Sequence, residues 1–287
     1  MPVFNNAATI RRAIESLLAQ SRTDLRLVIS DDGSTDGTAD ICDEYAARDS
    51  RVSVERQQKN LNYGNFRFVL QRARTPYFMF AAGDDWWHPT FVERMIGALG
   101  DEPRAVCAVS RVQFVRPDGA STLATGTKPL TGDAPSNIAQ FLAAGDDNSR
   151  MYGVFRTDVA QRAFPPRDFF AYDWAFSVGT LLEGSHLEIP EVLLWRDYTN
   201  PDRYVAYVRR DARRAIDRVF PLFPFTRDVI GRLRIPLTYA IARELFWLNA
   251  DFHLHYLQRF HPAGARTSNR ILQTINRAAG AARKRLR

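Results

Sequence analysis

The sequence predicts an α/β protein with a mostly parallel sheet flanked by helices, followed by a helical C-terminal region. Short apolar runs alternate with helical segments over the first hundred residues, which is typical of β-α-β units in a parallel sheet. Two of these runs lead directly into paired acids, Asp31-Asp32 and Asp84-Asp85. From about residue 204 onward every segment has a helical pattern. We therefore predict an α/β domain at 1–203 and a basic helical region at 204–287.

Strands and helices alternate regularly in the first half. The expected strands are Met1–Phe4, Leu25–Ser30, Val52–Glu55 and Tyr77–Phe80, and the expected helices are 10–18, 39–47, 66–74 and 90–99. Ile10, Ile14 and Leu17 share one face of the first helix. Residues 77–80 are uniformly apolar, which predicts a central strand buried on both faces. Pro89 suits the first turn of the helix that follows.

The pattern is looser after residue 100. The expected strands are Ala105–Ser110, Val112–Val115, Tyr152–Arg156, Leu187–Ile189 and Val192–Trp195, with helices at 138–144 and 174–182 and a polar loop at 121–135. We expect the α/β domain to consist of two halves, residues 1–115 and residues 116–203.

Composition limits the cellular setting. Hydrophobic residues make up 45% of the chain, enough for a sizeable core, but no run of about 18 apolar residues predicts a transmembrane helix. The first residues lead into a polar segment, unlike a secretory signal. Cys42 and Cys107 have no metal-ligand spacing, so we expect buried free thiols in a reducing, cytoplasmic setting.

Charge is unevenly distributed. Residues 201–287 contain 18 lysines and arginines against 6 acids, whereas residues 1–200 contain 21 against 26. An acidic body with a basic tail does not resemble a nucleic-acid-binding domain, so we expect no nucleic acid partner. An apolar stripe from Val205 to Val219 accompanies the arginines. It favours either peripheral contact with the inner face of a membrane or a packed helical subdomain with a solvated arginine face.

Asp84 and Asp85 are the strongest candidates for ligand chemistry. Two adjacent carboxylates are costly unless a cation shares them, and a strand end in an α/β sheet is where ligands bind. Mg²⁺ and Mn²⁺ prefer such oxygen ligands. The alternative is a charged pair at a helix start, since acids are favoured in a first turn.

The segment Asp31-Asp32-Gly33-Ser34 has two interpretations. It can be a turn with a helix cap, or an acidic loop that accepts from a nucleobase imide or a ribose hydroxyl. Ser30 occupies the position where one large class of phosphatases has its nucleophilic aspartate. The sequence also has no Gly-X-Gly-X-X-Gly or Walker-type loop, which argues against dinucleotide or P-loop binding.

Together these motifs resemble the family-2 glycosyltransferases of the Rossmann-like GT-A fold. The resemblance covers about residues 1–200 and rests on Pro2–Asn5, Ser16–Gln20, Asp31–Thr38 and Asp84-Asp85 with Pro89. It implies that residues 1–115 form a nucleotide-sugar-binding half and residues 116–203 an acceptor-side half. It implies that Pro2, Phe4 and Asp32 hold the nucleotide of a donor, with Asp31 as a neighbour. It also implies that Asp85 is the metal ligand and that Asp84 faces the donor sugar or ribose.

The same resemblance implies a general base at the start of a late helix. Tyr172-Asp173-Trp174 matches that site, with Tyr172 in place of a glutamate, and Val192–Arg196 fits downstream. Asp173 is therefore the candidate base, and its structural alternative is a helix N-cap.

Three weaker candidates remain. Arg67 or Lys59 could contact the diphosphate, although a solvated surface charge is equally compatible with either residue. Trp86 could stack on a sugar face, while Trp87 beside it could belong to the core. His88 could add a metal or phosphate contact or be structural.

The predicted function is metal-assisted, inverting transfer of a sugar from a nucleotide diphosphate sugar to an acceptor hydroxyl. The acceptor would be a saccharide or a lipid-linked molecule, in the assembly of surface polysaccharide or glycolipid. A non-enzymatic nucleotide-sugar-binding or membrane-associated scaffold is the alternative. A nucleotidyltransferase fits less well, because residues 5–8 offer no glycine-rich, basic phosphate loop.

Overall fold

The computed structural model describes two compact units. The described residues are 1–144, 147–197, 217, 220–232 and 237–260. Unit 1 comprises Met1–Asp168 and Tyr172–Asn200, and unit 2 comprises Phe169–Ala171 and Pro201–Arg287. The stripe expected from Val205 to Val219 lies outside the described residues.

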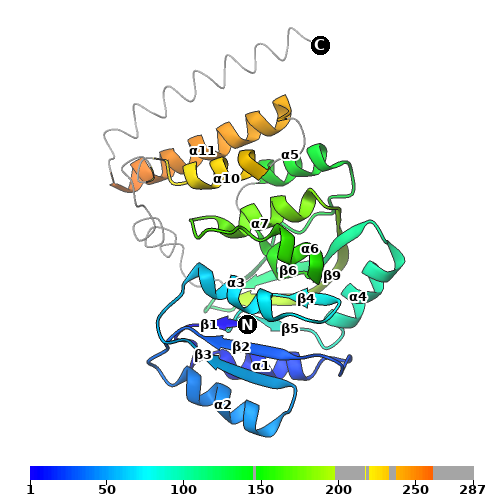
Figure 1. Cartoon of the computed structure of the whole chain (residues 1–287), viewed down its shortest axis with the longest axis vertical. Coiled ribbons are helices and arrows are strands. Elements are labelled where there is room, and N and C mark those ends of the chain that lie inside the picture. The colour runs from blue at the N-terminus through cyan, green and yellow to red at the C-terminus, as the bar shows by residue number, and fades with distance from the viewer. Residues whose placement is uncertain (145–146, 198–216, 218–219, 233–236, 261–287) are drawn as a thin grey trace. The chain divides into compact units, whose positions relative to one another are not determined.

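Unit 1 begins with a parallel sheet, sheet A, in the strand order β1-β2-β3 (Figure 1). Its strands are β1 (Pro2–Val3), β2 (Leu27–Asp31) and β3 (Val52–Arg56). Val3 pairs with Asp31, so the carboxyl ends of β1 and β2 lie side by side. The loops that follow these two strands therefore start from the same edge of the sheet.

Sheet B is mixed and larger, in the order β4-β8-β6-β9-β5, with β7 paired to β6. Its strands are β4 (Tyr77–Met79), β5 (Trp86–Trp87), β6 (Ala105–Val115), β7 (Ser121–Leu123), β8 (Val154–Arg156) and β9 (Ser185–Asp197). The long central pair β6–β9 is parallel, and the other pairings are antiparallel.

Helices cover both sheets of unit 1. They are α1 (Ile10–Leu18), α2 (Thr38–Arg48), α3 (Tyr63–Arg72), α4 (Phe91–Asp101), α5 (Ala134–Ala144), α6 (Thr157–Ala163) and α7 (Tyr172–Leu181), with a 3₁₀ helix η1 (Ser149–Tyr152). Unit 2 contains α10 (Phe223–Arg232) and α11 (Tyr239–Phe260). No helix in the described part of the chain combines the length and the apolar character needed to cross a bilayer.

The core of unit 1 explains why the acids can be held in place. The face of α1 that contains Ile10, Ile14 and Leu17 is buried, as its spacing predicts. Phe80 and Phe155 both pack on Phe176 of α7, with ring centroids 5.7 and 5.0 Å away. Burying one such side chain contributes roughly 1.5–3 kcal/mol, so these contacts fix α7 against sheet B.

The strand before the paired acids differs from the expectation. Residues 77–79 form an edge strand, β4, which pairs antiparallel with β8. A cavity of about 850 Å³ is lined by residues of both β2 and β4, among them Leu27, Val28 and Met79. The prediction of a central strand at 77–80 is therefore wrong. A uniformly apolar run indicates packing on both faces, but it does not reveal which neighbours supply the backbone hydrogen bonds.

After residue 100 the strands differ from the prediction. Two pairs of predicted strands are each one longer strand, and β7 lies within the expected polar loop at 121–135. Residues 105–115 form one strand, and register shifts around Ser110 and Arg111 account for the apparent break. Residues 185–197 likewise form one strand. Trp86-Trp87 forms a short strand on β9 that the sequence did not indicate. Cys42 and Cys107 are free and buried, as predicted.

Candidate active site

The loop after β1 is bonded to the loop after β2. The backbone N–H of Asn5 donates to Ser34 Oγ over 2.9 Å, and that of Asn6 donates to Thr38 Oγ1 over 2.7 Å. Thr35 N–H donates in return to Asn5 Oδ1 over 2.9 Å. Asn5 has φ 54°, a left-handed conformation that asparagine tolerates better than most residues. Ser34, Thr35 and Thr38 thus connect the two loops.

The first loop and helix α1 also contact the segment that carries the paired acids. Thr9 Oγ1 donates to the carbonyl of Gly83 over 2.8 Å, and Arg12 Nη2 donates to the carbonyl of Asp84 over 3.0 Å. A Cβ at Gly83 would stand 3.0 Å from Asn6 Cγ, so the close approach favours glycine. The acidic segments after β2 and β4 are therefore connected through residues 5–12.

Asp31 and Asp32 have different surroundings although both are buried. The Asp32 carboxylate accepts from the backbone N–H of Leu61 at 2.6 Å and of Asn62 at 2.9 Å. Burial raises the pKa of Asp32, and these two hydrogen bonds oppose the rise. Asp31 Oδ2 accepts from Ser34 N–H, whereas its Oδ1 is buried without a partner among the described residues. Asp32 thus holds the 60–62 loop, and Asp31 retains a free acceptor.

Asp85 is buried in an ion pair. It is 1% exposed, and its Oδ2 accepts from Arg196 Nε over 3.1 Å. Burial raises the pKa of Asp85 to about 7, and the guanidinium opposes the rise. Arg196 lies 4.2 Å from the ring centroid of Tyr152, and its Nη1 is 3.5 Å from Ser149 Oγ. The second acid of the pair therefore points into the protein, toward a fixed positive charge.

Asp173 lies at the start of α7 and is held by a side chain from the segment before η1. Asn148 Nδ2 donates to Asp173 Oδ2 over 3.1 Å, and Ser177 Oγ donates to Asn148 Oδ1 over 2.9 Å. Burial raises the pKa of Asp173, while the bond from Asn148 opposes the rise. A carboxylate with a raised pKa is suited to accept a proton near neutral pH.

Adjacent residues connect the two acidic positions. Asn148 contacts Asp173, and its neighbour Ser149 contacts Arg196, the partner of Asp85. Burial raises the pKa of Tyr152, and the charges of Asp85 and Asp173 raise it further. The segment after β4 and the start of α7 are thus connected through Asn148, Ser149 and Arg196.

Trp86 is in contact with a cation and is stacked with a second indole. The Arg12 guanidinium lies 3.7 Å from the centroid of its ring, and Trp195 stacks on it at 6.3 Å with an interplanar angle of 6°. Arg12 Nη2 also donates to Asp197 Oδ2 over 2.9 Å. Trp87 is buried in the core. Of the two tryptophans, Trp86 is the one beside the acids and only half-buried.

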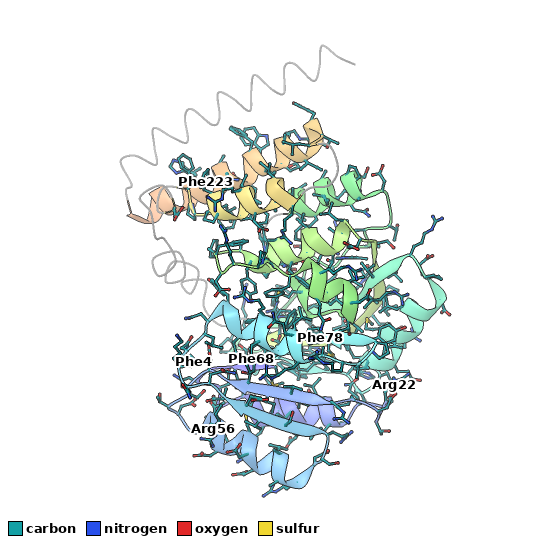
Figure 2. The ribbon with its side chains drawn as sticks, viewed as in Figure 1. Phe4, Arg22, Arg56, Phe68, Phe78 and Phe223 are labelled. Atoms are coloured by element: carbon teal, nitrogen blue, oxygen red, sulfur yellow. The ribbon has the colours of Figure 1, made fainter. Side chains whose placement is uncertain are left out.

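Other predicted residues have mixed placements. Pro2 lies in β1, and Phe4 at its end is 47% exposed (Figure 2). Arg67 Nη2 donates to Asp168 Oδ1 over 2.6 Å, so this arginine has an acidic partner within unit 1. Lys59 is exposed.

The carboxylates of Asp84 and Asp85 are the type of oxygen ligand that Mg²⁺ and Mn²⁺ prefer, but two carboxylates are too few to complete the coordination of such an ion. In the described part of the chain, no group of three or more His, Cys, Asp or Glu side chains could hold a metal ion. These ions commonly bind through one or two carboxylates together with substrate phosphates and water. The residues therefore fit a metal whose remaining ligands come from a bound diphosphate.

Four residues near the acids were not assigned roles from the sequence: Arg12, Asn148, Tyr152 and Arg196. Arg196 had a usable signal, because it is a charge that directly follows the apolar run 192–195, and a charge in such a strand needs a partner. The others had none, because their roles depend on contacts between segments distant in sequence.

Comparison with known proteins identifies the family. Residues 1–160, more than half of the chain, match the model of glycosyl transferase family 2. The chain belongs to this family. The putative glycosyltransferase EpsH of Bacillus subtilis is 34% identical over 113 residues, which cover 39% of this chain and 33% of EpsH.

Solved structures agree on the fold of this family-2 chain. Staphylococcus aureus TarS 1–349 in complex with UDP-GlcNAc has a TM-score of 0.64 at 16% identity, covering 90% of this chain and 71% of that one. The mannosyltransferase PcManGT from Pyrobaculum calidifontis, in complex with GDP-Man and Mn²⁺, has a TM-score of 0.58 at 16% identity, covering 97% and 78%. At these identities the likeness establishes the GT-A-like fold alone. The chain spans 33% to 60% of the length of the first curated relatives it matches.

Proposed function

We propose that this family-2 chain transfers a sugar from a nucleoside diphosphate sugar to an acceptor hydroxyl, with inversion at the anomeric carbon. The observation that carries the proposal is the connection of Asp85 to Asp173 through Arg196, Ser149 and Asn148. Inverting transfer needs one site for a departing diphosphate and a base for the incoming hydroxyl, at a shared reaction centre. We take residues 1–203 as the catalytic domain.

The nucleotide would bind at the carboxyl ends of β1 and β2. Phe4 offers an exposed ring at that edge, and Pro2 shapes the strand before it. The unpartnered Oδ1 of Asp31 can accept from a base imide or a ribose hydroxyl. Asp32 would act by holding the 60–62 loop. The relative EpsH is named a putative glycosyltransferase. The structures of TarS and PcManGT contain UDP-GlcNAc and GDP-Man, respectively, which supports a nucleotide-sugar donor for this chain.

Asp85, with Asp84 beside it, would hold a divalent metal together with the donor diphosphate. The bound metal would supply Lewis acidity to the leaving diphosphate. Asp173 would remove the proton of the acceptor hydroxyl as that oxygen bonds to the anomeric carbon. The bond from this carbon to the β-phosphate oxygen breaks at the same time, and the diphosphate leaves with the electron pair. Asn148 would keep the base oriented.

Unit 2 would contact an anionic membrane surface, where lipid-linked acceptors are found. Six of the eight large hydrophobic side chains exposed in the described part of the chain belong to it: Phe220, Phe223, Ile230, Leu237, Tyr239 and Phe246. Phe223 and Ile230 are seven residues apart on α10, as are Tyr239 and Phe246 on α11, so each pair shares a helix face. Together with the basic composition of 201–287, this favours peripheral membrane contact at the cytoplasmic face.

Calorimetric titration of UDP and GDP, each with and without Mn²⁺, followed by donor turnover assays, tests the proposal. Nucleotide binding strengthened by Mn²⁺, with turnover lost in Asp85→Ala and Asp173→Asn but kept in Asp118→Asn, is the expected result. Asp118 is an exposed acid in a surface turn and serves as the matched control. Wild-type turnover in both site variants would overturn the site assignment, and binding without any turnover would favour the scaffold.

A further inference from the structure

The carboxylate proposed to hold the metal already has a cation beside it. Arg196 Nε lies 3.1 Å from Asp85 Oδ2, and the two side chains are 21% and 2% exposed. A guanidinium keeps its proton under all physiological conditions, so this positive charge is permanent. Asp85 is therefore neutralised by the protein itself.

Arg196 is held firmly in this position. Its guanidinium lies 4.2 Å from the ring centroid of Tyr152 and 5.5 Å from that of Phe114. Its Nη1 is 3.5 Å from Ser149 Oγ. The next residue, Asp197, is tied to Arg12. The aromatic rings on Arg196 and the ion pair beside it orient the guanidinium toward Asp85.

A divalent ion on Asp85 would therefore stand close to a second positive charge. In a buried setting the repulsion between them is only weakly screened. Asp84 and Asp197 act electrostatically on Asp85, and Asp147 acts on Arg196, but among the described residues no group of three or more His, Cys, Asp or Glu side chains is placed to hold the ion. A diphosphate is negatively charged, and its oxygens can contact the metal ion and the guanidinium at the same time. It can therefore reduce the repulsion between these two positive charges.

We propose that Arg196 is the resident counter-cation of Asp85 and makes metal binding conditional on the donor. Before the donor binds, the guanidinium neutralises Asp85 and disfavours a divalent ion. When the diphosphate binds, its negative charge interacts with the Arg196 guanidinium, and the Asp85 carboxylate becomes available to the metal. Arg196 is a positioning residue in this role, and the inference rests on the proposed nucleotide-sugar site.

Such an arrangement has a thermodynamic signature. If the diphosphate raises the affinity for the metal by some factor, the metal must raise the affinity for the diphosphate by the same factor. We expect a factor of at least about thirty in the wild type. The metal alone should bind weakly, although carboxylates of the right kind are present.

The experiment measures Mn²⁺ binding by electron paramagnetic resonance at pH 8, with no nucleotide and with saturating UDP or GDP. Arg196→Gln removes the positive charge of this side chain. Arg196→Lys keeps the positive charge but replaces the planar guanidinium with an ammonium group. Arg150→Gln is the control, because Arg150 is also buried but pairs with His186 rather than with Asp85. Thermal melts verify that each variant is folded.

In Arg196→Gln, Mn²⁺ alone should bind about tenfold more tightly than in the wild type, and the coupling with the nucleotide should shrink. Arg196→Lys and Arg150→Gln should keep weak nucleotide-free binding. Equal Mn²⁺ affinity in the wild type with and without nucleotide would overturn the inference, as would identical behaviour of the Gln and Lys variants. Failure of UDP and GDP to bind at all would instead count against the proposed function.

Discussion

Asn148 donates a hydrogen bond of 3.1 Å to the Asp173 carboxylate, and it is itself fixed by Ser177 Oγ at 2.9 Å. This contact orients the acid and stabilises its charged form. Burial raises the pKa of Asp173, and Asn148 limits that rise. The properties of the proposed base therefore depend on a side chain from a different segment.

Replacing Asn148 should move the pH dependence of transfer. In Asn148→Ala the hydrogen bond that lowers the Asp173 pKa is lost, so the pKa rises and the base stays protonated to a higher pH. The acidic limb of kcat/KM should shift upward, as measured over pH 5–9. Asp173→Asn should lose about 10²–10⁴-fold in kcat at all pH values. An unchanged acidic limb in Asn148→Ala would contradict the role given to Asn148.

Breaking the buried ion pair should be costly in stability. Asp85→Ala leaves the Arg196 guanidinium without its carboxylate, and such losses cost about 3 kcal/mol. The double variant Asp85→Ala/Arg196→Met removes both charges and should recover a large part of that loss. Urea unfolding compares the wild type, the single variants Asp85→Ala and Arg196→Met, and the double variant. Arg94→Ala, which breaks the exposed pair with Glu191, should unfold like the wild type and provides the control. Strictly additive effects of Asp85→Ala and Arg196→Met would argue against the pair.

Replacing Asp31 should mainly weaken nucleotide binding, whereas replacing Asp32 should mainly lower the stability of the fold. Asp32→Asn has one acceptor oxygen in place of two, so one of the two loop N–H groups loses its bond, at a cost of about 1–2 kcal/mol in unfolding free energy. Asp31→Asn should leave stability nearly unchanged and weaken nucleotide diphosphate binding by about tenfold or more. Urea unfolding and calorimetry separate the two effects. The reverse pattern would assign the nucleotide contact to Asp32.

Arg67 should contribute little to donor binding. Its guanidinium already pairs with Asp168, and both side chains are partly exposed, so the pair is worth less than about 1 kcal/mol. Arg67→Gln and Asp168→Asn should have similar small effects on stability and change nucleotide affinity by less than about threefold. A large loss of affinity in Arg67→Gln alone would mean that this arginine turns to the diphosphate when the donor binds.

The exposed apolar residues of unit 2 should control membrane contact. Phe223→Ser/Ile230→Ser should reduce sedimentation with vesicles that contain anionic phosphatidylglycerol by about tenfold, because apolar burial and charge attraction act together. Leu123→Ser removes an even more exposed apolar side chain from unit 1 and should bind like the wild type. Binding should be lost in purely zwitterionic vesicles. Equal vesicle binding by both serine variants would indicate that another surface is involved.

The sequence alone determined the fold class and the positions of the acids. Alternation of apolar runs with helical periodicity identifies α1, α2 and the strands of sheet A, because side-chain spacing directly reflects local geometry. The acids that follow those strands are visible for the same reason. Asp173 was reached through the family resemblance, and the structure brings it near Asp85 without testing its role.

Tertiary structure alone decided which partners these residues have. Strand pairing is a contact between distant segments, so the edge position of β4, the pairing of Trp86 with β9 and the division of labour between Asp31 and Asp32 have no local signal. The pairing of Asp85 with Arg196 spans 111 residues and arises only when sheet B forms. Local physical chemistry therefore fixed which chemical groups are present, and long-range packing fixed what each carboxylate contacts.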